Sequence, residues 1–132
     1  MGSNYPPSSG RERTALQVKR LRPQVTTGST FEIKTGCGSI FVTINEDDKG
    51  PCEVFVRGGK HAGCISCQME GFGRLLSLAM RLGGSLDDCI KQVSGLQCST
   101  PTWYDGQQIL SCADAVSLAL KRYLQEKNDG QS

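Results

Sequence analysis

Residues 29–46 read STFEIKTGCGSIFVTINE, and their hydrophobic pattern decides the fold class. Apolar and polar residues alternate on both sides of a central Gly-Cys-Gly, which is the period of a half-buried β-strand. The glycines on either side of Cys37 indicate a tight bend or a close approach of two backbones. We therefore predict a β-hairpin with Cys37 at or beside its turn.

The next segments extend this hairpin and then change to helical periodicity. A polar turn at residues 45–51 is followed by a third strand at residues 52–57, which completes an antiparallel meander. A first helix is expected over about residues 66–82, ended by Gly83-Gly84. We assign its apolar stripe to the core: Met69, Phe72, Leu75, Leu76, Ala79, Met80 and Leu82.

Two capping signals predict two more helices. Ser85 is a good N-cap, and Asp87 and Asp88 lie in the first turn, where the helix dipole favours acidic groups. Ser111 is an equally good N-cap, with Asp114 three residues later and an apolar face beyond it. The prediction is an α+β fold, a three-stranded antiparallel β-meander packed against three α-helices.

Length and composition place these elements in one domain. A chain of 132 residues fits a single domain, which we assign to residues 24–126, between a disordered basic leader at 1–23 and a disordered tail at 127–132. The leader carries five basic residues and one acidic residue, which leaves 10 basic and 12 acidic residues elsewhere. The folded part is therefore near neutral, without a basic face for nucleic acid.

The chain has no apolar run long enough for a membrane span and no apolar stretch of a secretory signal at its N-terminus. We expect a cytoplasmic protein. The oligomeric state, and whether the chain is a fragment of a longer protein, stay open.

The seven cysteines indicate metal binding, redox chemistry or packing, because a reducing cytosol would keep them as thiols. Cys52 and Cys89 repeat with core residues and are expected to be buried. Cys112 falls in the first turn of the last helix, where we expect the helix dipole to lower the pKa of its thiol.

Residues 96–110 (LQCSTPTWYDGQQIL) form a long loop, and such loops are usually functional or held in place by another group. Trp103 and Tyr104 within it are either anchors for a partner or a lid over the hairpin. We favour packing over the hairpin.

Several short motifs, taken in order, resemble the TSCPD domain. The likeness covers about residues 22–125, although Leu110 and Ala113 depart from the motif that names the family, which has proline after the cysteine, at the position of Ala113. Alanine is a good helix former, so the fold prediction stands. The matching segments are 35–38 (TGCG), 42–46 (VTINE), 63–64 (GC), 73–79 (GRLLSLA), 95–98 (GLQC) and 111–115 (SCADA).

The resemblance implies a biological setting. TSCPD domains occur alone and near the C-terminus of adenosylcobalamin-dependent (class II) ribonucleotide reductases, the enzymes that make deoxyribonucleotides for DNA replication. The resemblance therefore implies an accessory domain that binds the reductase catalytic body in cis or in trans. It brings no radical cysteine and no cobalamin site to these residues, so adenosylcobalamin would belong to the parent reductase and not to this chain.

Four cysteines stand where the family pattern has them, each at a bend, in a loop or at a helix start: Cys37, Cys64, Cys98 and Cys112. Thiolates can converge from such positions, and four of them make a closed tetrahedral zinc site without an open position for catalysis. A zinc site using most of these four is our leading hypothesis, and buried thiols without a metal are the alternative. No acid-base or nucleophile-base pair is visible, so we expect no enzyme activity from this chain alone.

Two other functions stay open. Cys64 and Cys67 have the spacing of a redox dithiol at a helix N-terminus, which would make a small thiol-disulfide relay. The loop at residues 58–63 could bind a phosphate or nucleotide through Gly58, Gly59, Lys60 and Gly63, although we favour a plain glycine-rich connection. His61 is a further candidate ligand or, as we favour, a solvated loop residue.

Overall fold

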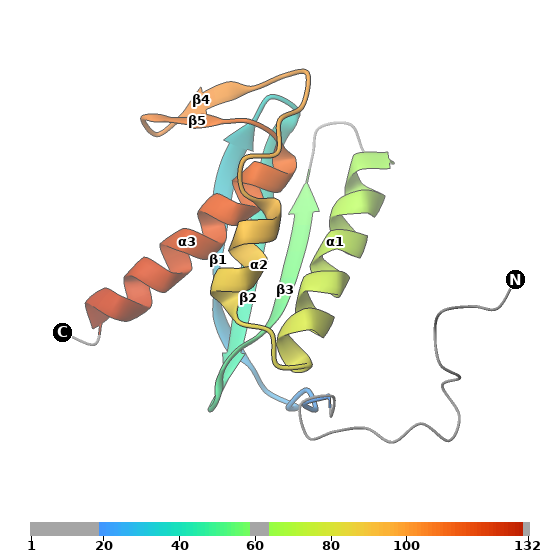
Figure 1. The fold of residues 1–132 in the computed structure, drawn as a ribbon, viewed down its shortest axis with the longest axis vertical. Helices are drawn as coiled ribbons and strands as arrows, with labels where there is room; N and C mark the ends of the chain where they lie inside the picture. Colours follow the sequence, from blue (N-terminus) through green and yellow to red (C-terminus); the bar gives the residue numbers. More distant parts are fainter. Residues whose placement is uncertain (1–18, 59–63, 131–132) are drawn as a thin grey trace, which may run out of the picture.

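The computed structural model describes residues 19–58 and 64–130, with the backbone alone at Cys64. It confirms the α+β fold: three helices, a three-stranded antiparallel sheet and a small two-stranded hairpin (Figure 1). The elements are β1 (Thr27–Thr35), β2 (Gly38–Asp47), β3 (Gly50–Gly58), α1 (Cys64–Arg81), α2 (Leu86–Val93), β4 (Thr102–Tyr104), β5 (Gln107–Ile109) and α3 (Cys112–Gly130).

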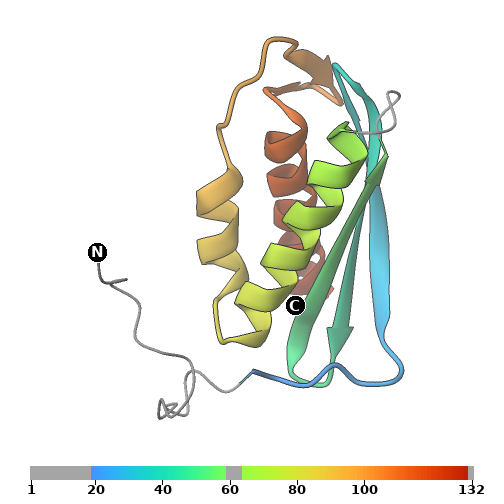
Figure 2. The same ribbon diagram turned by 90° about the vertical axis from the view of Figure 1, so that its right-hand side faces the viewer.

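The main sheet has the order β1-β2-β3, and the helices cover only one of its faces (Figure 2). The β1–β2 hairpin turns at Gly36-Cys37, which confirms the prediction for Cys37. Because side chains alternate across a strand, every second residue enters the core. The buried apolar residues of the sheet are Ile33, Ile40, Val42, Ile44, Val54, Val56 and, as predicted, Cys52.

The first helix lies directly against β3, one of the two edge strands of this sheet. The Ser77 hydroxyl accepts a hydrogen bond from the N–H of Val54 at 2.9 Å and donates one to the Gly73 carbonyl at 2.8 Å. A Cβ atom at Gly73 would lie 2.9 Å from the Val54 carbonyl oxygen, closer than real Cβ atoms come. Glycine at this position therefore lets α1 pack closely against β3.

The predicted core stripe of α1 was partly wrong. Met69, Leu76 and Met80 are buried, but Leu75 is 69% exposed, and Leu82 and Ala79 are also exposed. The reason is geometric: only one side of α1 faces the sheet, and the predicted stripe is wider than that contact.

An N-terminal strap, residues 19–26, runs across the end of the sheet where β3 begins. The N–H of Arg20 donates to the Arg81 carbonyl at 2.8 Å, and the Arg20 guanidinium donates to the Pro51 carbonyl at 2.8 Å. Arg22 forms two hydrogen bonds with Glu53, at 2.6 and 3.2 Å. This strap covers Glu53 so fully that only 1% of the residue is exposed.

The caps of the other two helices confirm the sequence predictions. Ser85 accepts a hydrogen bond from the N–H of Asp88 at 3.1 Å, and Ser111 accepts one from the N–H of Asp114 at 3.0 Å. Cys89 on α2 is buried, as predicted. No helix among the described residues is both long enough and apolar enough to cross a membrane.

The loop at residues 96–110 contains the β4–β5 hairpin, which the sequence analysis missed. Its two-residue turn is Asp105-Gly106, and both residues have positive φ angles, 55° and 77°. Such a turn matches the twist of two paired strands. The loop therefore has structure of its own.

Candidate metal centre

The thiol end of the molecule, which we define as Cys37, Cys98 and Cys112 with Thr35 and Thr100, is assembled from three separate segments. Cys37 lies in the β1–β2 turn, Cys98 in the long loop and Cys112 at the first position of α3. Figure 1 shows that these segments meet at one end of the sheet.

The β1–β2 turn touches the long loop at Gly36. A Cβ atom there would lie 2.0 Å from the Thr100 carbonyl oxygen, so the position accepts no side chain larger than hydrogen. The Thr35 hydroxyl donates to the Gly38 carbonyl at 2.7 Å and accepts from the N–H of Cys37 at 3.1 Å. These contacts fix Cys37 beside the loop.

The N-terminus of α3 fixes the other side of the loop. Asp114 accepts hydrogen bonds from the N–H groups of Gly95 and Leu110, at 2.9 and 3.1 Å. The Ser111 hydroxyl donates to the Leu96 carbonyl at 2.6 Å. The capping residues of α3 therefore also hold both ends of the loop that carries Cys98.

Two threonine hydroxyls lie among the three thiols. The Thr35 oxygen is 3.6 Å from the sulfur of Cys112. The Thr100 oxygen is 3.7 Å from the sulfur of Cys37 and 3.5 Å from that of Cys98. The structure thus brings together three of the four cysteines that the sequence analysis selected.

The pKa values of two of these thiols shift in opposite directions. The hydroxyl and the N–H of Thr100 lower the pKa of Cys98, because both can donate to a thiolate. Burial raises the pKa of Cys112; the Thr35 hydroxyl opposes this, and the nearby Cys37 and Cys98 add to it. The pKa of Cys112 is therefore raised and not lowered as predicted, because burial is the largest effect on it.

We expect iodoacetamide to alkylate Cys98 several-fold faster than Cys112 at neutral pH in metal-free protein, because the thiolate is the reactive form. Mass spectrometry of peptides after timed labelling measures both rates. Cys52, which is 0% exposed, serves as the unreactive internal control. Equal rates at Cys98 and Cys112 would contradict this expectation.

The remaining sequence-selected residues lie elsewhere or outside the described part. Cys64 is the first residue of α1, at the same end of the molecule as the thiols (Figure 1), but its side chain lies outside the description. Cys67 is exposed on α1. Of the phosphate-loop candidates only Gly58 is described, with a φ of 118°, whereas Gly59, Lys60, His61 and Gly63 are not. The relay and the phosphate site stay predictions.

The donor chemistry of the thiol end suits zinc, since thiolates are its preferred structural ligands. Among residues 19–58 and 64–130, however, no group of three or more His, Cys, Asp or Glu side chains is already arranged to hold a metal. The four-cysteine zinc site therefore stays a prediction, in which Cys64 would be the fourth ligand.

The two aromatic residues of the long loop behave differently. Tyr104 is partly buried and donates a hydrogen bond to the Glu32 carbonyl at 3.3 Å, which ties β4 to β1. Trp103 is 71% exposed, so the prediction that it packs over the hairpin is wrong. The cause is the strand itself, because neighbouring residues of β4 point to opposite sides.

A scan against protein-family models matches the TSCPD domain over residues 11–124. The chain belongs to the TSCPD domain family. Searches of curated proteins and of solved structures gave no match. The match covers every described strand of this TSCPD domain, helices α1 and α2, and most of α3.

Sequence reasoning missed the residues that organise the thiol end of this TSCPD domain. Thr35 and Thr100 were not selected, although each lies two residues from a selected cysteine. Asp114 was selected only as a helix-capping residue, whereas it also accepts hydrogen bonds from both ends of the loop. Hydroxyl groups two residues from cysteines were the signal that could have identified the two threonines.

Proposed function

We propose that this TSCPD domain is a non-catalytic, cytoplasmic accessory domain, stabilised by zinc, that binds the catalytic body of an adenosylcobalamin-dependent ribonucleotide reductase. The family membership supports the reductase setting. The observation that carries the zinc proposal is the gathering of Cys37, Cys98 and Cys112 from three separate segments.

Cys37, Cys64, Cys98 and Cys112 would hold the zinc, which would supply a structural cross-link. The three described ligands come from the hairpin turn, the long loop and α3. These three segments are already held together by close packing at Gly36 and by hydrogen bonds of Ser111 and Asp114. Zinc would therefore cross-link segments that are positioned without it.

Metal analysis tests the zinc proposal. We expect about one zinc per chain after purification without chelator, and a melting temperature at least about 10 °C lower after chelation, because structural zinc contributes many kcal/mol to folding. The double variant Cys98→Ser/Cys112→Ser should lose the metal. Cys67→Ser, which changes an exposed cysteine, should keep it. A metal-free wild-type protein that is insensitive to chelator would overturn the zinc proposal.

Sedimentation velocity tests the accessory role. The domain is mixed with the catalytic body of an adenosylcobalamin-dependent reductase from which the reductase's own TSCPD domain has been removed. We expect a complex with one domain per catalytic body. Independent sedimentation of the two proteins at all concentrations would overturn the proposal.

A further inference from the structure

The outer side of α1 carries an apolar row that nothing in the described chain covers. We define the α1 outer stripe as Gly71, Leu75, Leu78 and Leu82, which are spaced four, three and four residues apart and therefore align along the helix. The three leucines are 69%, 40% and 37% exposed. A row of exposed leucines on a helix is typical of a protein contact.

Gly71 within this stripe has no structural reason inside the described chain. Glycine in a helix interior costs about 1 kcal/mol relative to alanine. A Cβ atom at Gly71 would meet nothing within 4 Å, in contrast to Gly73, whose Cβ would strike β3. The glycine leaves a notch beside Leu75, where another helix can approach closely.

The flank of the stripe that faces β3 is basic. A cavity of about 470 Å³ between the strap, β3 and α1 is lined by Phe55, Leu78 and five charged residues. Four of the charged residues are basic and one is acidic: Lys19, Arg22, Arg74, Arg81 and Glu53. A second cavity, of about 450 Å³, shares Phe55 and Arg74 with the first and adds Arg57 and Glu70.

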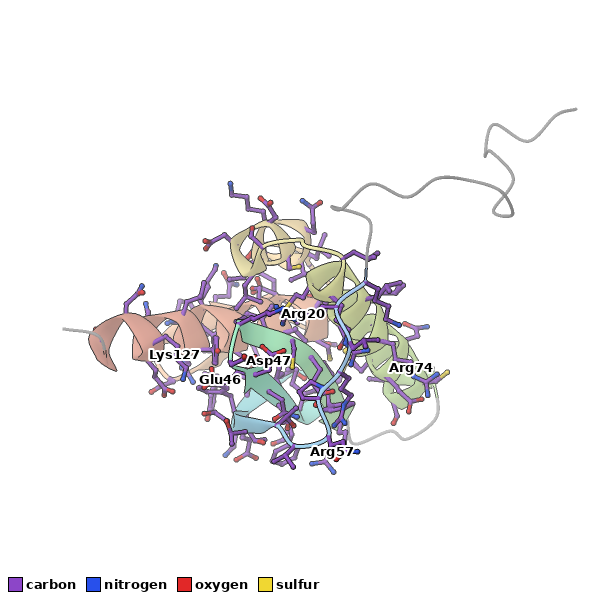
Figure 3. The ribbon with its side chains drawn as sticks, turned by 90° about the horizontal axis from the view of Figure 1, so that it is seen from below. Arg20, Glu46, Asp47, Arg57, Arg74 and Lys127 are labelled. Atoms are coloured by element: carbon purple, nitrogen blue, oxygen red, sulfur yellow. The ribbon has the colours of Figure 1, made fainter. Side chains whose placement is uncertain are left out.

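Arg74 has capacity for another anion. Arg74 faces Glu70 at 3.6 Å in an exposed pair, and such pairs contribute little. Arg81, by contrast, already faces the buried Glu53 at 3.5 Å, so it adds positive charge to this flank without being the contact itself. Figure 3 shows Arg57 and Arg74 on the same flank of the molecule. This basic flank, Lys19, Arg22, Arg57, Arg74 and Arg81, borders the stripe along its length.

We propose that the α1 outer stripe and the basic flank together bind an amphipathic helix of a partner protein, with Asp or Glu beside its apolar face. The leucines and the notch at Gly71 would receive the apolar face, and the basic flank would pair with the carboxylates. A phosphate or nucleic acid would leave the leucines bare. A second copy of the chain would bring its own basic flank against this one.

Two synthetic helical peptides test this proposal. Both have leucines at the spacing of the stripe, and the flanking positions hold Glu in one and Lys in the other. We expect fluorescence anisotropy to show the Glu peptide binding the full chain at least about tenfold more tightly, because like charges oppose docking. Added salt should narrow that difference. Equal binding of the two peptides, or binding of neither, would overturn the proposal.

Matched variants locate the site. Leu75→Asp should abolish binding of the Glu peptide, and Arg74→Glu should reverse the preference toward the Lys peptide. Both residues are exposed, and circular dichroism verifies that the variants are folded. Lys121→Asp, at an exposed position on α3, should change nothing. Unchanged binding by Leu75→Asp, or a dimer of wild-type chains that Leu75→Asp dissociates, would each overturn the proposal.

The peptide assay contains no reductase, so its result is independent of the proposed function. If neither peptide binds, the docking proposal is overturned, and the proposed accessory role is unaffected. Failure to bind the reductase would remove the accessory role and leave the preference for an acidic helix to be measured.

Discussion

A Gly73→Ala variant should lose roughly 2 to 3 kcal/mol of its free energy of unfolding, a cost typical of overpacking against a rigid neighbour. The added methyl group would lie 2.9 Å from the Val54 carbonyl oxygen and 3.3 Å from the Val56 nitrogen. Both are backbone atoms of β3 and cannot rotate away. The helix must shift, which also stretches the bonds from Ser77 to Val54.

Gly71→Ala is the matched control, two residues earlier on the same helix. The new methyl group would meet nothing within 4 Å, so alanine should stabilise the chain by about 0.5 to 1 kcal/mol through helix propensity. Urea unfolding of the wild type and both variants measures these differences. Equal shifts for the two variants would show that close packing of α1 on β3 does not limit position 73.

A Glu53→Gln variant should lose about 2 to 4 kcal/mol of its free energy of unfolding. Removing the Glu53 carboxylate leaves the charge of its arginine partners uncompensated. The carboxylate accepts hydrogen bonds from Arg22, Thr26 and Asn45, and Arg81 lies 3.5 Å away. The variant should also free the strap, which faster hydrogen exchange at residues 20–26 would reveal. Asp105→Asn, which breaks an exposed pair with Arg122, should change stability little.

The effect of Glu53 should depend on pH. Burial alone would raise the pKa of Glu53, but hydrogen bonds from Arg22 and Asn45 and the charges of Arg22 and Arg81 outweigh it, so the pKa is lowered. The stabilisation is then complete above the ordinary carboxyl value of 4.5 and is lost as the pH falls through the lower pKa of the folded state. The difference in the free energy of unfolding between wild type and Glu53→Gln should therefore disappear over that acidic range. A difference that does not change with pH would contradict a lowered pKa for Glu53.

The sheet and the helix caps could be predicted from the sequence because their causes are local. The alternation of apolar and polar residues around Cys37 predicts the strands, and a serine three residues before an aspartate predicts a helix start. Each signal involves only a few neighbouring residues. The β4–β5 hairpin was missed because its strands are three residues long, too short for a period to show. Its Asp105-Gly106 turn was nevertheless a readable signal.

The errors on α1 and at Cys112 have a different origin. Hydrophobicity alone cannot tell a leucine that faces the sheet from one that faces outward, so Leu75 was assigned to the core. The pKa of Cys112 depends on burial and on thiols that are distant in sequence. Its position at a helix start predicts neither of these. Convergence of Cys37, Cys98 and Cys112 was predictable only through the family resemblance.

The strap, residues 19–26, lies at the opposite end of the domain from the thiol end. Lys19 precedes Arg20, whose N–H bonds to the carbonyl of Arg81 at the last residue of α1. Figure 1 shows this end of α1 opposite the end of the sheet where the thiol-bearing segments meet. The described chain therefore enters the domain at the end opposite the thiol end. An immobilisation tag placed there would leave the thiol end accessible for labelling and metal titration.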